Sequence, residues 1–340
     1  MKKVKFGVIA DLHVDIQPDA KERLFDFLEA AKREDVDFII ELGDFCYPEL
    51  SKMQISEKNE RRLRSGALNL YADKRAIIDA YNNFGKPAYH VIGNHDCDVS
   101  TRDEYMKFVG MEKLGPYYSF DVGGFHFVVL DANYVRYEGR YIPFAEMDYQ
   151  KQYKNTDERT LPFISPDQLA WLEYDLWHTE YPTVLFSHQR LVDENEYTLV
   201  NHEELGKILR SAPNGVVLSL NGHEHIDTIL RKDNVWYYNV NSISNYWLSP
   251  DDVMFTEERY SPEIHKRYPY LKCTAPYEDA LYAFVTLDER GATIKGRQSK
   301  FIGSTPDDMK VYDYPYYKKN VYDLGFRITP SVEDRYLPFD

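Results

Sequence analysis

Short apolar runs alternate with segments of helical spacing in the first part of the chain. The runs predict buried strands at 4–10, 38–42 and 88–92. Apolar residues at helical spacing predict a helix over 21–33, and the polar stretch 55–84 is expected to contain another. Strands that alternate with helices in this way predict a buried, largely parallel sheet.

Turn residues divide the rest of the chain. Gly123-Gly124 separates two strand-like segments and predicts a hairpin, and two further hairpins are expected at 226–241 and 280–297. Ser165-Pro166-Asp167 predicts the start of a helix that runs to about residue 178. Short strands at 183–187 and 216–221 are expected on either side of a helix over 202–210.

Two segments lack periodicity. Residues 133–163 are polar and rich in tyrosine, which predicts an inserted loop over one face. Residues 301–340 are rich in Tyr and Pro, and we expect an ordered tail because so many aromatic residues argue against disorder. With no internal repeat and no clear linker, we predict one domain over 1–300 with the tail 301–340 packed on it.

Composition narrows the class of protein. Hydrophobic residues make up 43% of the 340 positions, enough for a buried core. Lys and Arg total 41 against 56 acidic residues, a formal charge of −15, so a long nucleic acid is not an expected partner. Such a charge would suit a site for divalent cations. No apolar run reaches 18 residues, so no membrane span is expected.

The cysteines and the N-terminus favour a reducing cytoplasm. Cys46, Cys97 and Cys273 are an odd number in a long chain, which argues against a disulfide framework. Cys46 and Cys97 closely follow two polar motifs, at 43–44 and 93–96, and we expect them to be small buried packing residues rather than redox-sensitive groups. Met1-Lys2-Lys3 resembles the start of a signal peptide, but the apolar run after it is short and no small-residue cleavage site follows. A leader removed earlier would leave no trace, and that alternative stays open.

Five short polar motifs follow the ends of predicted strands. They are Asp11-Leu12-His13, Gly43-Asp44, Gly93-Asn94-His95-Asp96, Ser187-His188 and Gly222-His223-Glu224-His225. The carboxyl ends of strands in an open α/β sheet converge on one crevice, so these motifs are expected to meet. Each glycine precedes a polar residue where close backbone approach favours the absence of a Cβ.

Carboxylate, amide and imidazole groups make up the expected ligand set. Residues two apart on an extended segment project to one side, so Asp11 with His13, and His223 with His225, face one site. Such ligands suit Mn²⁺, Fe or Zn²⁺ better than Ca²⁺ or a thiolate-bound metal, and they suffice for two ions that share a carboxylate. Any one motif alone is commonplace, whereas all five in this order would rarely arise by chance.

The series resembles the signature of the calcineurin-like metallophosphoesterase superfamily, and in particular its small bacterial-type phosphodiesterases. The motifs run from residue 11 to residue 225. The resemblance implies a four-layer α/β/β/α sandwich of the metallo-dependent phosphatase type with a dinuclear metal centre. It implies one metal held by Asp11, His13, Asp44 and His225, and a second held by Asp44, Asn94, His188 and His223, with Asp44 bridging.

The expected chemistry follows from such a metal pair. Two cations about 4 Å apart lower the pKa of a water between them, and the resulting hydroxide attacks phosphorus. His95 would contact the phosphate and protonate the leaving group, so His95 and Asp44 are the expected catalytic residues. The resemblance to the small bacterial-type phosphodiesterases rests partly on Asp96 after Gly-Asn-His, and it implies a small phosphodiester substrate of the nucleotide or glycerophosphodiester type. The alternatives are a phosphomonoesterase, either acid-phosphatase-like or a nucleotidase, then a nuclease and a non-catalytic scaffold.

Further residues near the motifs are candidates for contact with the substrate, together with Asn94 and His95. Tyr47 fits the Gly-Asp-x-x-Tyr pattern of purple acid phosphatases, in which the tyrosine ligates iron(III), but His13 departs from their pattern and favours Tyr47 as a pocket wall. Arg190 is expected either to hold a phosphate oxygen or to be solvated. Trp247 is expected either to stack on a nucleobase or to pack at the rim. The oligomeric state is left open.

Overall fold

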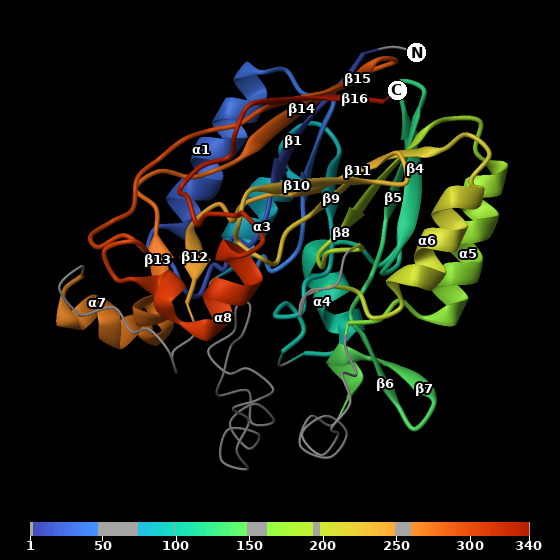
Figure 1. Cartoon of the computed structure of the whole chain (residues 1–340). Helices are drawn as coiled ribbons and strands as arrows, with labels where there is room; N and C mark the ends of the chain where they lie inside the picture. The colour runs from blue at the N-terminus through green and yellow to red at the C-terminus, as the bar shows by residue number, and fades with distance from the viewer. Residues whose placement is uncertain are drawn as a thin grey trace.

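The described residues of the computed structural model form two six-stranded sheets that lie face to face (Figure 1). These residues are 3–46, 74–98, 100–147, 162–192, 198–248 and 260–339. In pairing order the first sheet contains β16 (Arg335–Pro338), β15 (Gly291–Lys295), β14 (Ala283–Asp288), β1 (Val4–Ile9), β2 (Phe38–Glu41) and β3 (Ala88–His90). The second contains β10 (Thr228–Lys232), β11 (Val235–Asn239), β9 (Val216–Asn221), β8 (Thr183–Ser187), β5 (Phe125–Val129) and β4 (Tyr118–Val122).

Helices cover the outer faces of both sheets. On the first sheet lie α1 (Ala20–Arg33) and α3 (Arg75–Asn82), and on the second lie α5 (Pro166–His178) and α6 (His202–Ser211) (Figure 1). The arrangement is a four-layer α/β/β/α sandwich, so the predicted fold class is confirmed. Shorter elements connect these layers: α4 (Arg102–Val109), β6 (Tyr134–Tyr137), β7 (Arg140–Pro143), β12 (Asn245–Trp247), α7 (Pro262–Arg267), β13 (Thr274–Pro276) and α8 (Pro315–Tyr317).

The continuous apolar runs arise because the central strands are buried on both faces. In β5, Phe127 belongs to the core between the sheets, whereas Val128 packs with the side chains of α5 and α6. The core between the sheets is aromatic: Phe6 of β1 lies edge-on to Phe186 of β8, with ring centroids 5.6 Å apart. Phe38 of β2 lies 5.1 Å from Phe127. Burial of such rings is a large share of the stabilising free energy of a core.

Strand direction follows the predicted pattern in part. The strands β1, β2 and β3 are parallel, as the alternation with helices predicts. The hairpins β4–β5, β10–β11 and β14–β15 also form where they were predicted. The antiparallel pairing of β1 with β14 is a long-range contact that adds the last hairpin to the first sheet.

Two segments differ from the expected absence of regular structure. The segment predicted as a loop contains the antiparallel hairpin β6–β7, which turns at Glu138-Gly139, where both residues have positive φ. Within the predicted tail, β16 pairs with β15 and forms the edge of the first sheet. Of the stretch 55–84, only the part containing α3 lies within the described residues. The division into a domain of residues 1–300 and a tail stays a prediction.

Candidate active site

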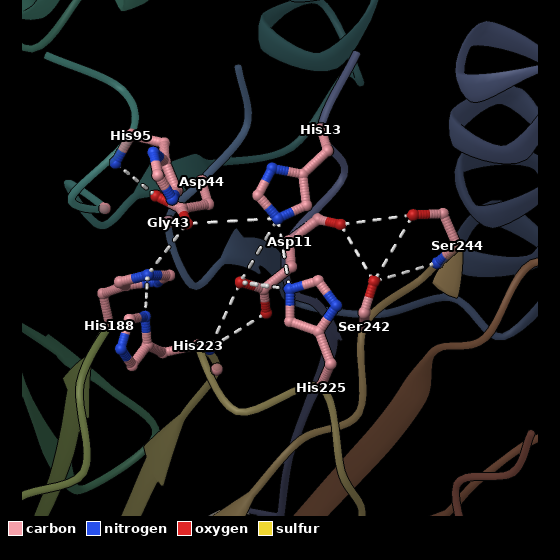
Figure 2. A network of polar contacts seen from close by, with 12 residues as sticks. Asp11, His13, Gly43, Asp44, His95, His188, His223, His225, Ser242 and Ser244 are labelled. Atoms are coloured by element: carbon pink, nitrogen blue, oxygen red, sulfur yellow. Dashed lines mark hydrogen bonds and ion pairs between the residues drawn. The ribbon is translucent and has the colours of Figure 1, made fainter. Parts of the chain in front are cut away.

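Polar side chains from both sheets meet where the strands end, in two clusters (Figure 2). The first cluster contains Asp11, His13 and His225, and the second contains Asp44, His188 and His223. Within each cluster, one donor atom from every residue lies within 4.8 Å of the others. Five of these six residues are buried and His223 is half-buried, so the clusters are built into the protein rather than gathered on its surface.

Asp44 lies between the two clusters. Its Oδ2 is 3.2 Å from Nε2 of His188 and 4.0 Å from Nε2 of His13, so one carboxylate oxygen faces a histidine of each cluster. Oδ1 of Asn94 lies 3.0 Å from the same His188 nitrogen. This is the position that a carboxylate shared by two cations would occupy.

The spacing of donor atoms suits metal ions. Ligand bonds of about 2.0–2.2 Å put two donors of one ion roughly 3–3.5 Å apart. Nε2 of His13 lies 3.1 Å from Nε2 of His225, which is 3.4 Å from Oδ1 of Asp11. In the second cluster, Nε2 of His188 lies 3.1 Å from Nδ1 of His223. The donor set therefore fits two ions, and it contains the oxygen and imidazole ligands expected from the sequence.

The electrostatics favour cations as well. Burial opposes the charged form of His188, but the Asp44 carboxylate outweighs it and raises the pKa of His188 to about 10. Burial also opposes ionisation of Asp44, yet His188 and His95 hold the pKa of Asp44 well below its usual range. The pKa of His13 is lowered by burial, with His225 adding to the effect against the pull of Asp44. Positive charge is stabilised here, and His13 keeps the neutral form that binds metals.

Backbone hydrogen bonds orient the ring nitrogens. Nδ1 of His188 donates to the carbonyl of Leu42 at 2.8 Å, and Nδ1 of His225 donates to the carbonyl of Asn245 at 2.7 Å. With a cation in place of the Nε2 proton, each bond would leave the Nε2 lone pair facing a cluster, which is the usual way in which an outer contact sets the tautomer of a metal-binding histidine.

Five of the cluster residues have left-handed backbone conformations. The φ angles are 53° at Asp11, 46° at His13, 54° at Asp44, 71° at His223 and 52° at His225. Such angles are unfavourable for residues with a Cβ and persist where the surrounding structure imposes them, commonly at functional sites. The strained segments therefore point to selection for side-chain position rather than for stability.

The motif glycines allow the loops to approach one another. A Cβ on Gly93 would lie 2.1 Å from the backbone nitrogen of Asp44, and one on Gly222 would lie 2.7 Å from Oδ2 of Asp11. A Cβ on Gly43 would lie 2.7 Å from Nδ1 of His188, and the φ of Gly43 is +93°. The prediction that these positions exclude a side chain is confirmed.

His95 stands beside the clusters with a carboxylate partner of its own. Its Nδ1 lies 2.7 Å from Oδ2 of Asp98, and its backbone N–H donates to Oδ1 of Asp44 at 2.8 Å. Burial disfavours the imidazolium, but Asp98 and Asp44 outweigh it and raise the pKa of His95 to about 9. His95 is therefore able to hold a proton at neutral pH.

Comparison with known proteins adds the family. The sequence model of the calcineurin-like phosphoesterases matches residues 4–227. The chain belongs to this family. It is accordingly a metal-dependent phosphoric ester hydrolase of a family that uses dinuclear metal centres, and the two clusters are its candidate metal-binding groups. No match was found among curated protein sequences.

Solved structures of similar fold include phosphatases. A dimetal phosphatase from Danio rerio is 19% identical, with 88% of this chain and 98% of that chain covered and a TM-score of 0.59. GAP50, the anchor in the inner membrane complex of Plasmodium, is 13% identical over 87% of this chain and 84% of its own, with a TM-score of 0.48. A purple acid phosphatase from yellow lupin seeds is 12% identical over 87% and 51%, with a TM-score of 0.46.

Within this calcineurin-like phosphoesterase, the three expected substrate contacts outside the motifs have different surroundings. Trp247 is half-buried, with its ring centroid 6.2 Å from that of His13, so it borders the first cluster. Arg190 is 4% exposed and its Nη2 donates to Glu224 and Thr228. Tyr47 lies outside the described residues.

The supporting roles of two buried polar residues, Asp96 and Ser242, were not predicted. Asp96 accepts hydrogen bonds from the backbone N–H groups of Asp44, Cys46 and Gly93, at 2.8–3.0 Å, and so ties two motif loops together. Its oxygens face these amides, and the expected link between Asp96 and a phosphodiester stays a prediction. Ser242 donates to the Asp11 carbonyl at 3.0 Å. A run of small polar residues after a strand, Asn-Ser-Ile-Ser-Asn at 241–245, was the available signal.

Cysteines and helices complete the description. Cys46, Cys97 and Cys273 are all buried thiols outside any disulfide, and burial was expected of Cys46 and Cys97 as packing residues. Among the described residues, every helix is too short or too polar to cross a membrane.

Proposed function

We propose that this phosphoesterase hydrolyses a small phosphodiester of the nucleotide or glycerophosphodiester type, with two metal ions held by the clusters. One ion would be held by Asp11, His13, Asp44 and His225, and the other by Asp44, Asn94, His188 and His223. The observation that carries the proposal is the position of the Asp44 Oδ2 atom between a histidine of each cluster. The ions would be Mn²⁺, Fe or Zn²⁺, in keeping with nitrogen and oxygen ligands.

Residues of the chain itself would bind the metal ions, hold them at a fixed separation and protonate the leaving group. A metal pair, when bound, activates water and neutralises charge on the phosphoryl oxygens. Asp44 would hold both ions at a fixed separation. His95, whose Nδ1 is engaged by Asp98, would carry its transferable proton on Nε2 and give it to the departing ester oxygen. A pKa of about 9 keeps that proton in place at neutral pH.

Charge supports the choice of a diester over a monoester. A phosphodiester carries one negative charge, whereas a monoester carries closer to two at neutral pH because its second pKa is about 6. Arg190, the arginine two residues beyond His188, is ion-paired with Glu224 at 2.7 Å and brings no uncompensated charge. A phosphomonoesterase is the second candidate, because the same clusters and the same proton donor would serve that reaction.

A substrate panel with Mn²⁺ tests the proposal. Bis-aryl phosphate, cyclic nucleotides, nucleotide diphosphate esters and glycerophosphodiesters would be compared with a simple aryl phosphate. We expect at least one diester to be hydrolysed faster than the monoester. Faster hydrolysis of the aryl phosphate than of every diester would favour the phosphomonoesterase. If no substrate is hydrolysed with Mn²⁺, the panel is repeated with Fe and with Zn²⁺, and no hydrolysis with any of the three metals would favour a scaffold.

Two substitutions test the residue roles. Asp44→Asn should lose activity and metal content together, because it weakens the ligand shared by both ions. His95→Ala should keep its metals and lose roughly 10²–10⁴-fold in kcat. His126→Ala is the matched control: His126 is also buried and bonded to carboxylates, Asp121 and Asp175, but it lies on β5 and belongs to neither cluster. Full activity and metal content in both site variants would refute the assignment.

Trp247 offers a test of the leaving group. Its half-buried ring beside His13 supports a role in stacking on a nucleobase. Trp247→Ala should raise KM for a nucleotide substrate and leave KM for bis-aryl phosphate close to wild type. Trp177→Ala, which alters an exposed tryptophan of α5, serves as the control. Equal changes for both substrates would count against stacking.

A further inference from the structure

Glu224 stands between two candidate metal ligands and is itself engaged in a buried ion pair. It follows His223 of the second cluster and precedes His225 of the first. Its side chain is 7% exposed, and that of its partner Arg190 is 4% exposed. Nη2 of Arg190 donates to Oε2 of Glu224 at 2.7 Å. Charges this deeply buried are stable only when paired, which sets this pair apart from an exposed surface pair.

The same guanidinium nitrogen contacts the loop at a second point. Nη2 of Arg190 also donates to Oγ1 of Thr228, the first residue of β10, at 2.9 Å. Arg190 therefore attaches both the middle and the end of segment 222–228 to the loop that carries His188. The backbone makes a parallel link, because Gly222 N–H donates to the His188 carbonyl at 3.1 Å.

The attached segment has a backbone that needs support. His223 and His225 have φ angles of 71° and 52°, a conformation that is costly for any residue with a Cβ. The C-terminal part of the chain also contacts the ion pair, with the guanidinium carbon of Arg190 6.0 Å from the ring centroid of Phe326. Solvent and salt screen a buried ion pair only weakly, so the attraction between Arg190 and Glu224 helps to hold the segment in this conformation.

We propose that Arg190 and Glu224 are positioning residues that set the separation of the two metal sites. His223 and His225 belong to different clusters, so a clamp on the residue between them fixes one cluster relative to the other. This inference rests on the proposed function, because it takes the two clusters to be metal sites. It assigns a role to Arg190 other than contact with phosphate, and a role to Glu224, which the motif left unassigned.

Titration of the full chain with Mn²⁺ alone tests the clamp. Metal-stripped wild type should bind two Mn²⁺ ions and give the electron paramagnetic resonance spectrum of an exchange-coupled pair. Glu224→Gln and Arg190→Met should weaken Mn²⁺ binding by about 10–100-fold, the usual effect of removing an outer contact. Their spectra should show isolated Mn²⁺ in place of the coupled pair. A role in stability alone would lower Tm without changing this spectrum.

Matched variants complete the design. Arg297→Met removes an arginine that pairs with Asp26 far from the clusters, and it should bind Mn²⁺ as wild type does. The double variant Arg190→Met/Glu224→Gln should bind no more weakly than the weaker single variant, because the two residues act as a unit. Glu224→Gln preserves the shape of the side chain, so it decides the question if Arg190→Met does not fold.

The outcomes separate the two proposals. Wild type that binds two Mn²⁺ ions, with single variants that bind equally well and keep the coupled spectrum, would overturn the clamp and leave the proposed function standing. Additive losses in the double variant would also overturn it. Wild type that takes up no Mn²⁺ pair would overturn the proposed function, and the clamp with it.

Discussion

Gly93→Ala adds a single methyl group where the loops of the candidate site are closest. The added Cβ would lie 2.1 Å from the backbone nitrogen of Asp44 and 2.2 Å from its Oδ1. Non-bonded heavy atoms pack best at about 3.5–4.0 Å, so one of the two loops must move by roughly 1 Å or more. The neighbours cannot yield easily, because the Asp44 nitrogen is bonded to Asp96 at 3.0 Å.

The expected loss follows from that displacement. Moving a reacting or metal-binding group by about 1 Å typically costs 10²-fold in rate. We therefore expect kcat/KM of Gly93→Ala to fall by about 10²-fold and its Mn²⁺ content to fall below two ions. Overpacking of this kind also lowers the free energy of unfolding by about 1–3 kcal/mol. The assays are hydrolysis of bis-aryl phosphate with Mn²⁺, metal analysis, and urea unfolding.

Gly215→Ala separates activity from stability. Gly215 has a φ of +75° and no atom within 4 Å of an added Cβ, so alanine there is strained but clashes with nothing. It should lose about 1–2 kcal/mol of stability and keep its activity. The reasoning is refuted if Gly93→Ala retains wild-type kcat/KM and two Mn²⁺ ions, or if Gly215→Ala loses as much activity at equal stability.

Three further predictions concern protons and metal. Burial raises the pKa of Glu41 to about 8, against about 4.3 in an unfolded chain, so wild type should lose stability between about pH 4 and pH 8. The glutamine of Glu41→Gln does not titrate, so the stability of wild type relative to Glu41→Gln should fall across that range in urea unfolding. A difference in stability that stays constant with pH would contradict this. Burial opposes the charge on His126, but the hydrogen bonds that its ring N–H groups donate to Asp175 and Asp121 outweigh burial and raise the pKa of His126. The stabilising effect of His126 is therefore complete below about pH 6.5 and is lost as pH rises through the folded pKa. The difference in unfolding free energy between wild type and His126→Gln should accordingly become smaller as pH rises. A difference that grows with pH would count against this prediction. Removal of metal by a chelator should lower Tm by several degrees, because an ion present at 100 times its Kd adds about 2.7 kcal/mol to the free energy of unfolding. Added Mn²⁺ should restore the Tm. An unchanged Tm would argue against metal binding in the folded state.

Local signals in the sequence account for much of the architecture. Strands β1, β2 and β3 are continuous apolar runs because both of their faces are buried, and burial leaves that pattern in any sequence. The start of α5 was readable because Ser165 caps the helix, accepting a hydrogen bond from the Gln168 N–H. The helix α4 was not predicted, although its start is also marked in the sequence, because Thr101 and Glu104 form a capping box. Its apolar spacing is short, so the cap was the clearer indication.

Long-range pairing was not readable. The strand β16 forms by pairing with β15 at the edge of the first sheet. Its residues, which include Arg335 and Tyr336, do not alternate between apolar and polar positions in a way that predicts a strand. The hairpin β6–β7 stands outside both six-stranded sheets, and no residue of β7 is buried, so the sequence of β7 shows no pattern of burial. A strand that owes its formation to a partner elsewhere needs no strong pattern of its own.

The sequence by itself determined which groups are available for chemistry: carboxylates, an amide and imidazoles at strand ends, with glycines where loops must come close. Only the tertiary structure decided how these groups are supported. Ser242 reaches the Asp11 carbonyl across 231 residues, Asp96 binds amides of a loop about 50 residues away, and Arg190 pairs with Glu224 rather than with solvent. A polar side chain has the same capacity to hydrogen-bond wherever it stands, so its partner depends on which distant loops the packed sheets bring together.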